Sequence, residues 1–90
     1  MRITFDPVKR ARTLQERKVD FEDAAELFAG QQFQFEDNRS DYGERRFMTI
    51  GRVKGRLVAV VWTPRGDGRH VKSMRKCNDR EQARYGPLLR

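Results

Sequence analysis

The sequence predicts one α+β domain of 90 residues, with an antiparallel sheet, two N-terminal helices on one face and a short C-terminal helix, ordered β-α-α-β-β-β-β-α. Apolar residues recur at helical spacing up to Gly30 and at a spacing of two beyond it. Residues 56–63 are apolar on both faces, which is typical of a central strand. Near the end, Asn78 and Glu81 have the spacing of a helix-capping box.

The N-terminal half begins with a short strand, because Ile3 and Phe5 alternate with polar residues. Asp6 can cap the first helix, and Pro7 fits its first position, where the missing N–H is tolerated. Apolar side chains follow at helical spacing: Val8, Ala11 and Leu14.

A second helix is expected from Asp20 to Gly30, with Asp23 completing a weak capping box. Its spacing predicts one buried face, formed by Phe21, Ala24, Ala25 and Phe28. We expect this stripe to pack in the core.

Four strands are expected after Gly30, separated by polar or glycine-containing turns: 32–36, 47–53, 56–63 and 69–75. Simple alternation in the last strand would place Arg69, Val71 and Ser73 on one face, and His70, Lys72 and Met74 on the other. Gly86-Pro87 should end the final helix.

Charge is distributed unevenly along the chain. Residues 1–50 hold 9 Lys and Arg against 10 Asp and Glu, whereas residues 51–90 hold 11 against 3, for a net charge of +7 overall. This asymmetry indicates a polyanionic partner, with nucleic acid the first candidate. The alternative is a solvated basic face that only confers solubility. No apolar signal or membrane-spanning run is seen, so a cytoplasmic protein without membrane contact is expected.

The residues available for chemistry are mainly cations on and beside the last strand. A single cysteine and a single histidine make a metal site unexpected, and no cofactor-binding motif occurs. RNA carries its own nucleophile, the 2′-OH, so guanidinium groups and one proton acceptor can suffice for cleavage. Crowded cations would lower the pKa of Lys72 or Lys76 and make a general base conceivable. Phosphate binding alone explains the same cations.

Four segments resemble the BrnT family, toxins of type II toxin–antitoxin systems with a RelE/ParE-like ribonuclease fold. The resemblance runs from about Ile3 to Tyr85 and rests on the order of these segments: 5–9 (FDPVK), 19–24 (VDFEDA), 43–51 (GERRFMTIG) and 55–63 (GRLVAVVWT), followed by 73–76 (SMRK). Two departures stand out. Arg17-Lys18 replace the family's usual His-Gly, and His70 and Lys72 replace an Arg and an aliphatic residue.

The resemblance implies an endoribonuclease that inhibits translation and is neutralised by a BrnA-like antitoxin. It implies contact with DNA only through the antitoxin, and it is compatible with a toxin homodimer within a heterotetramer. Arg75 and then Arg46 are the candidates for stabilising the transition state, because both lie in matching segments. The candidates for proton transfer are Lys72, His70 and Tyr85. The candidates for binding RNA are Arg65, Arg69, Lys76, Arg80 and Arg84.

Two other functions compete with an endoribonuclease. A non-catalytic module that binds RNA or protein would need only the cations, whereas an enzyme also needs a proton acceptor among them. A DNA-binding regulator is less favoured, because no helix-turn-helix pattern occurs.

Overall fold

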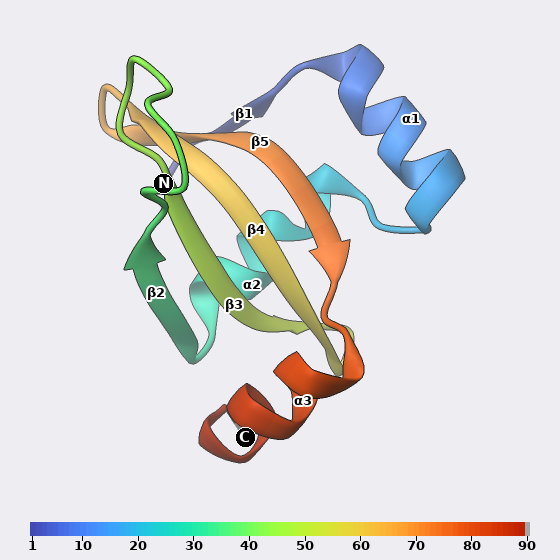
Figure 1. Ribbon diagram of the computed structural model, residues 1–90. Coiled ribbons are helices and arrows are strands. Elements are labelled where there is room, and N and C mark those ends of the chain that lie inside the picture. Colours follow the sequence, from blue (N-terminus) through green and yellow to red (C-terminus); the bar gives the residue numbers. More distant parts are fainter. Residues whose placement is uncertain (90) are drawn as a thin grey trace.

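Within residues 1–89, which the computed structural model describes, five strands form one sheet in the order β1-β5-β4-β3-β2 (Figure 1). The strands are β1 (Ile3–Phe5), β2 (Gln32–Glu36), β3 (Phe47–Val53), β4 (Arg56–Arg65) and β5 (Gly68–Lys76). The helices are α1 (Pro7–Arg17), α2 (Ala24–Ala29) and α3 (Asp79–Tyr85), with short 3-10 helices η1 (Phe21–Asp23) and η2 (Gly86–Leu88).

The segment expected at the centre of the sheet is central. β4 pairs with β5 on one side and β3 on the other, both antiparallel. Leu57 and Val60 of β4 are buried, as are Phe21 and Phe28 from the helical segment before β2. A strand apolar on both faces has to be covered on both, so only a central place satisfies it.

The sheet is mixed, so the expectation of a wholly antiparallel sheet is wrong. β1 pairs with β5 in parallel, with Ile3 opposite Arg69 and Phe5 opposite Val71. The alternation of a short strand indicates which side chains face the core, but it carries no information on the direction of a partner more than sixty residues away. The parallel pairing is set by the long connection through the helices and β2–β4.

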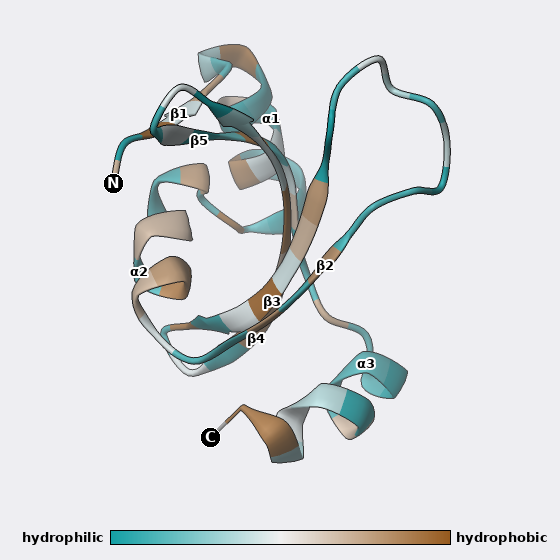
Figure 2. Ribbon diagram, turned by 90° about the vertical axis from the view of Figure 1, so that its left-hand side faces the viewer, coloured by the Kyte–Doolittle hydropathy of each residue, from teal (hydrophilic) through white to brown (hydrophobic). Residues whose placement is uncertain are grey.

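The two faces of the sheet are covered differently (Figure 2). α2 and η1 lie on one face, where Phe21, Leu27 and Met74 are part of the larger core; we call this the α2 face. α3 and η2 lie at one end of the opposite face, and the β2–β3 loop, residues 37–46, projects from the other end. No helix covers the centre of that side, which we call the open face; Met48, Ile50, Ala59 and Val61 point to it and are buried beneath neighbouring side chains.

Helix α1 begins as its sequence predicts, with the Asp6 carboxylate accepting from the Val8 N–H at 2.9 Å and Pro7 in the first position. Every residue of α1 is nevertheless at least partly exposed, and Val8 is 65% exposed. Polar contacts hold the helix instead. Arg10 donates two hydrogen bonds to Asp20, at 2.8 and 2.9 Å.

The second helical segment is split. Asp20 caps η1, its carboxylate accepting from Glu22 N–H at 3.0 Å, and α2 starts only at Ala24. The side chain of Asp23 makes no capping hydrogen bond at the start of α2, within the residues that the structure describes. Ala25 is exposed and Leu27 is buried in its place, because a 3-10 turn has three residues per turn and changes the phase of the stripe.

Candidate anion-binding face

A bulge in β5 decides which side chains reach the open face. The pairing between β4 and β5 shifts between Val61 and Trp62, so Lys72 has no partner residue on β4. As a result Val71 and Met74 both enter the core on the α2 face. The alternation that grouped Lys72 with Met74 is therefore wrong, because the extra residue reverses the phase of the strand.

Three cations converge on one carboxylate, that of Glu44 in the β2–β3 loop. Lys72 Nζ lies 3.0 Å from Glu44 Oε1, and Arg46 Nε lies 3.9 Å from the same oxygen. Arg65, at the end of β4, places Nη2 3.9 Å from Oε2. Lys72 is the largest cause lowering the pKa of Glu44. Sequence reasoning missed Glu44, since a loop carboxylate gives no sign of what it meets.

In the part of the chain that the structure describes, Arg46 has one unsatisfied hydrogen-bond donor, its Nε. Its guanidinium carbon lies 3.9 Å from the centre of the Tyr42 ring, so the side chain is held by stacking. Its Nε is buried, and within residues 1–89 it finds no hydrogen-bond acceptor. The loop is closed at its base, where the Asp37 N–H donates to the Arg46 carbonyl at 2.8 Å. An anionic ligand could satisfy this donor.

Arg75, the first candidate for transition-state stabilisation, is held by Glu81 of α3. Its two terminal nitrogens donate to the two carboxylate oxygens at 2.7 and 2.8 Å. This pairing is the largest cause that raises the pKa of Arg75 and lowers that of Glu81 to about 2. Glu81 also accepts from the Asn78 N–H at 2.9 Å, so the expected capping box is confirmed. The box therefore orients Arg75 as well as starting α3.

The other proton-transfer candidates lie at opposite ends of the sheet. Nδ1 of His70 is 2.7 Å from Oγ1 of Thr4, on β1. Burial is the main cause that lowers the pKa of His70, and the charges of Arg65 and Lys72 add to it. Tyr85, on α3, packs against the core of the open face, with its ring centre 5.1 Å from that of Phe33.

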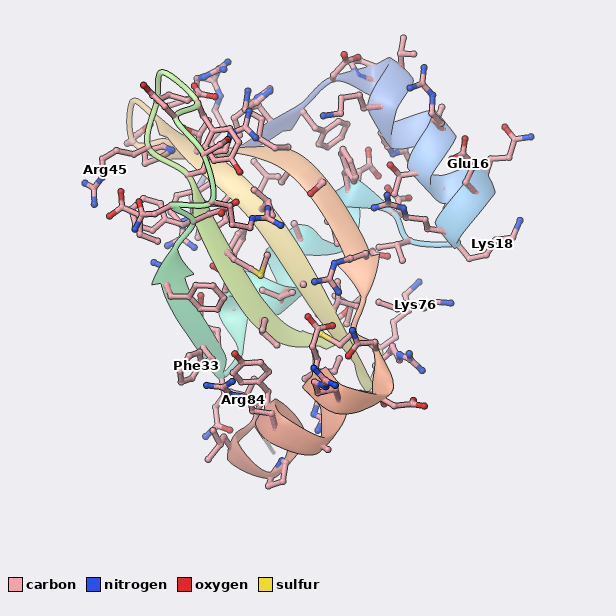
Figure 3. The ribbon with its side chains drawn as sticks, in the orientation of Figure 1. Glu16, Lys18, Phe33, Arg45, Lys76 and Arg84 are labelled. Carbon is pink, nitrogen blue, oxygen red and sulfur yellow. The ribbon has the colours of Figure 1, made fainter. Side chains whose placement is uncertain are left out.

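Not all the expected RNA-binding cations share one surface. The guanidinium carbon of Arg69 lies 4.3 Å from the ring centres of both Phe28 and Trp62, on the α2 face, and burial lowers its pKa. Lys76 pairs with Val58 of the core on the α2 face and lines a cavity together with Lys18, so it lies on that side of the sheet; Figure 3 shows it near the end of β5. Arg80 and Arg84 are exposed on α3, and Arg65 is exposed at the end of β4. A single surface that includes Arg69 is thus not formed.

A second group of cations, on α1, extends the site. A groove of about 260 Å³ runs between α1 and the bulged part of β5. Its lining residues are Lys9, Arg12, Thr13, Glu16, Arg17, Lys72 and Ser73. Sequence reasoning missed these α1 cations, although Lys9 and Arg12, together with the carboxylate of Glu16, have the three- and four-residue spacing that places side chains on one helix face.

Among the described residues, no group of three or more His, Cys, Asp and Glu side chains is placed to hold a metal ion. In the same part of the chain, no helix has the length and apolar character needed to cross a membrane.

The chain is thus an α+β domain in which three cations gather around one carboxylate on the open face of the sheet. A family model described as "Ribonuclease toxin, BrnT, of type II toxin-antitoxin system" matches residues 5–81, and the chain belongs to this family. The resemblance inferred from the four segments is therefore confirmed. The family is one of ribonuclease toxins, which implies RNA as the substrate and an antitoxin as the partner. No curated protein matches the chain.

Proposed function

We propose that this protein is a metal-independent endoribonuclease toxin of RelE-like fold, which a BrnA-like antitoxin neutralises by covering the open face. The supporting observation is the convergence of Lys72, Arg46 and Arg65 on the Glu44 carboxylate. A phosphodiester also carries one negative charge and presents two acceptor oxygens, so the scissile phosphate can take the place of Glu44 among these cations.

Cleavage would follow the chemistry that RNA itself supplies. The 2′-oxygen attacks the adjacent phosphorus, a base accepts the 2′-OH proton, the bond from phosphorus to the 5′-oxygen breaks, and an acid protonates that oxygen. The products are a 2′,3′-cyclic phosphate and a 5′-hydroxyl. Arg75 is the first candidate to stabilise the phosphorane-like transition state, and Arg46, with its unsatisfied Nε, is the second.

The groups proposed for proton transfer keep the order Lys72, His70 and Tyr85. Lys72 is favoured because its ammonium group lies among the cations that would hold the phosphate. His70 could accept a proton at neutral pH, since burial lowers its pKa. Tyr85 is supported only by its place beside the open face.

Contacts to phosphates away from the scissile bond are assigned to Arg65, Arg80 and Arg84, and to the groove lined by α1. Arg69 and Lys76 are left out of this part of the proposal, because they lie on the α2 side of the sheet. Lys76 then serves as a matched control for Lys72, being the same residue type on the same strand but on the other side.

A specific observation favours the non-catalytic alternative. Lys72 and Arg75 are each paired with a carboxylate, Glu44 and Glu81 respectively. A binding module could keep these pairs and use only the remaining cations. An enzyme that used Lys72 as its base would have to separate Lys72 from Glu44 and hold it as the neutral amine before it accepts the 2′-OH proton. The two functions differ in whether bound RNA is cut.

The test is single-turnover cleavage of RNA by saturating enzyme in EDTA. Lys72→Ala and Arg75→Ala should each slow cleavage by about 10²–10³, the scale of one lost transition-state donor. Lys76→Ala should leave the rate at which bound RNA is cleaved nearly unchanged. A substrate with 2′-deoxyribose at the cut site should not be cleaved. Intact RNA after prolonged incubation with the unaltered protein would favour the binding module, and cleavage of the deoxy substrate would exclude the 2′-OH mechanism.

A further inference from the structure

Three aromatic rings, two of them exposed and one partly buried, form a cluster beside the open face, where β2 meets α3. Phe33 and Phe35 are 41% and 40% exposed. Their ring centres lie 6.3 Å apart, and the ring of Tyr85 lies 5.1 Å from that of Phe33. We call Phe33, Phe35 and Tyr85 the aromatic platform. Figure 3 shows Phe33 at β2 near Arg84.

The pairing of the strands fixes the side of the sheet on which the platform lies. Phe33 pairs with Ile50, and Phe35 pairs with Met48. Both partners belong to the core of the open face, and directly opposed residues of an antiparallel pair point to the same side. The glutamines that alternate with the phenylalanines lie on the other side of β2. The platform therefore shares the open face with the proposed catalytic groups.

One row of residues across the sheet connects the platform to Arg75. The row runs from Phe33 through Ile50 and Ala59 to Arg75, one residue from each of four adjacent strands. It spans three interstrand spacings, about 14 Å in all. Ile50 and Ala59, at the centre of the row, are 1% and 2% exposed, so neighbouring side chains cover the sheet between the aromatic rings and the guanidinium. A short stretch of single-stranded RNA can bridge this distance.

The chemistry of the platform fits nucleobases. Exposed aromatic side chains on a sheet, beside cations that hold phosphates, are the usual means of binding unpaired bases. The guanidinium carbon of Arg84 lies 5.4 Å from the centre of the Tyr85 ring, and Arg75 lies at the far end of the row. Glu81, the nearby carboxylate, is already neutralised by Arg75. Because Arg75 and Glu81 neutralise each other, Arg84 is the cation that favours a ligand both aromatic and anionic at this place.

We propose that the aromatic platform is a base-stacking subsite, which binds unpaired bases of the RNA a short distance along the strand from the scissile phosphate. In this role Tyr85 stacks on a base, and proton transfer is left to Lys72 and His70. The inference rests on the proposed RNA substrate, but it does not require cleavage. It predicts that affinity has a component carried by bases, separate from the component carried by phosphates.

The experiment measures binding of a short single-stranded RNA, and of the same strand with abasic sites, at two salt concentrations. Unaltered protein should bind the abasic strand at least tenfold more weakly. Phe33→Ala/Phe35→Ala should bind the intact strand about tenfold more weakly or worse, with an unchanged salt slope, because no phosphate contact is lost. Val8→Ala, which truncates an exposed apolar residue on α1, is the matched control and should bind normally.

The outcomes separate this inference from the proposed function. Base-dependent binding without any cleavage would support the stacking role and count against the proposed enzyme. Cleavage with equal affinity for intact and abasic strands would support the enzyme and overturn the stacking role. Phe33→Leu/Phe35→Leu keeps apolar area but removes the rings, so full RNA affinity in this variant would overturn the stacking role. Loss of antitoxin binding in the alanine variant, with RNA binding intact, would make the platform a protein-docking surface and also overturn it.

Discussion

Glu81→Gln isolates the ion pair that positions Arg75. Glutamine keeps the shape of the side chain and an acceptor for the Asn78 N–H, so the capping box can persist while the charge is lost. A carboxyl whose pKa falls from 4.5 to about 2 would contribute about 3 kcal/mol to folding at neutral pH. Because the side chains of Arg75 and Glu81 are 39% and 20% exposed, solvent screening reduces the expected loss to about 1–2 kcal/mol.

Urea unfolding of the two proteins from neutral pH downward tests this value and its sign. The folded pKa of Glu81 is depressed, so its contribution is complete above about pH 4.5 and is lost as the pH falls toward 2. The free energies of unfolding should therefore differ by about 1–2 kcal/mol at pH 7, and the difference should shrink below about pH 4.5. Linear extrapolation with equal slopes is required for the comparison.

Asp79→Asn is the matched control, because it removes a carboxylate from the same first turn of α3 without touching the Arg75 pair. It should cost at most about 0.5 kcal/mol, the size of a charge–dipole interaction at a helix start. Equal losses in the two variants would mean that the helix start, and not the ion pair, accounts for the effect. A loss in Glu81→Gln that stays constant from pH 7 to pH 3 would refute the linkage argument.

Two further predictions concern ligands. Glu44→Gln removes the anion that competes with phosphate, so direct titration at low salt should show RNA binding about two- to fivefold more tightly. The single-turnover rate of cleavage should not change. A hundredfold slower rate would instead make Glu44 the general base. A peptide from an acidic antitoxin segment should raise the melting temperature of the protein. At a free peptide concentration one hundred times Kd, binding stabilises the folded state by about 2.7 kcal/mol. High salt should weaken this effect, because it screens the charges. An unchanged melting temperature at saturating peptide would count against binding of an acidic antitoxin segment.

Features carried by neighbouring residues were predictable from the sequence. The first helix starts at Pro7 behind its Asp6 cap, and the last helix starts with the Asn78 and Glu81 box, because capping is satisfied within three or four residues. The central place of residues 56–63 also followed from the chain itself, since only a strand covered on both faces can be apolar throughout. The family, and with it the class of substrate, was readable from the order of short segments.

The tertiary structure alone decided how the charged groups combine. The bulge at Lys72 changes which side chains of β5 face each side of the sheet, and the residues on either side of Lys72 do not predict this change. Glu44 meets its cations, and Arg69 is drawn against Phe28 on the other face, through contacts between segments far apart along the chain. Local pattern governs hydrogen bonds and burial within one element, whereas the partners of a long charged side chain depend on which elements pack side by side, and that is settled only when the whole domain folds.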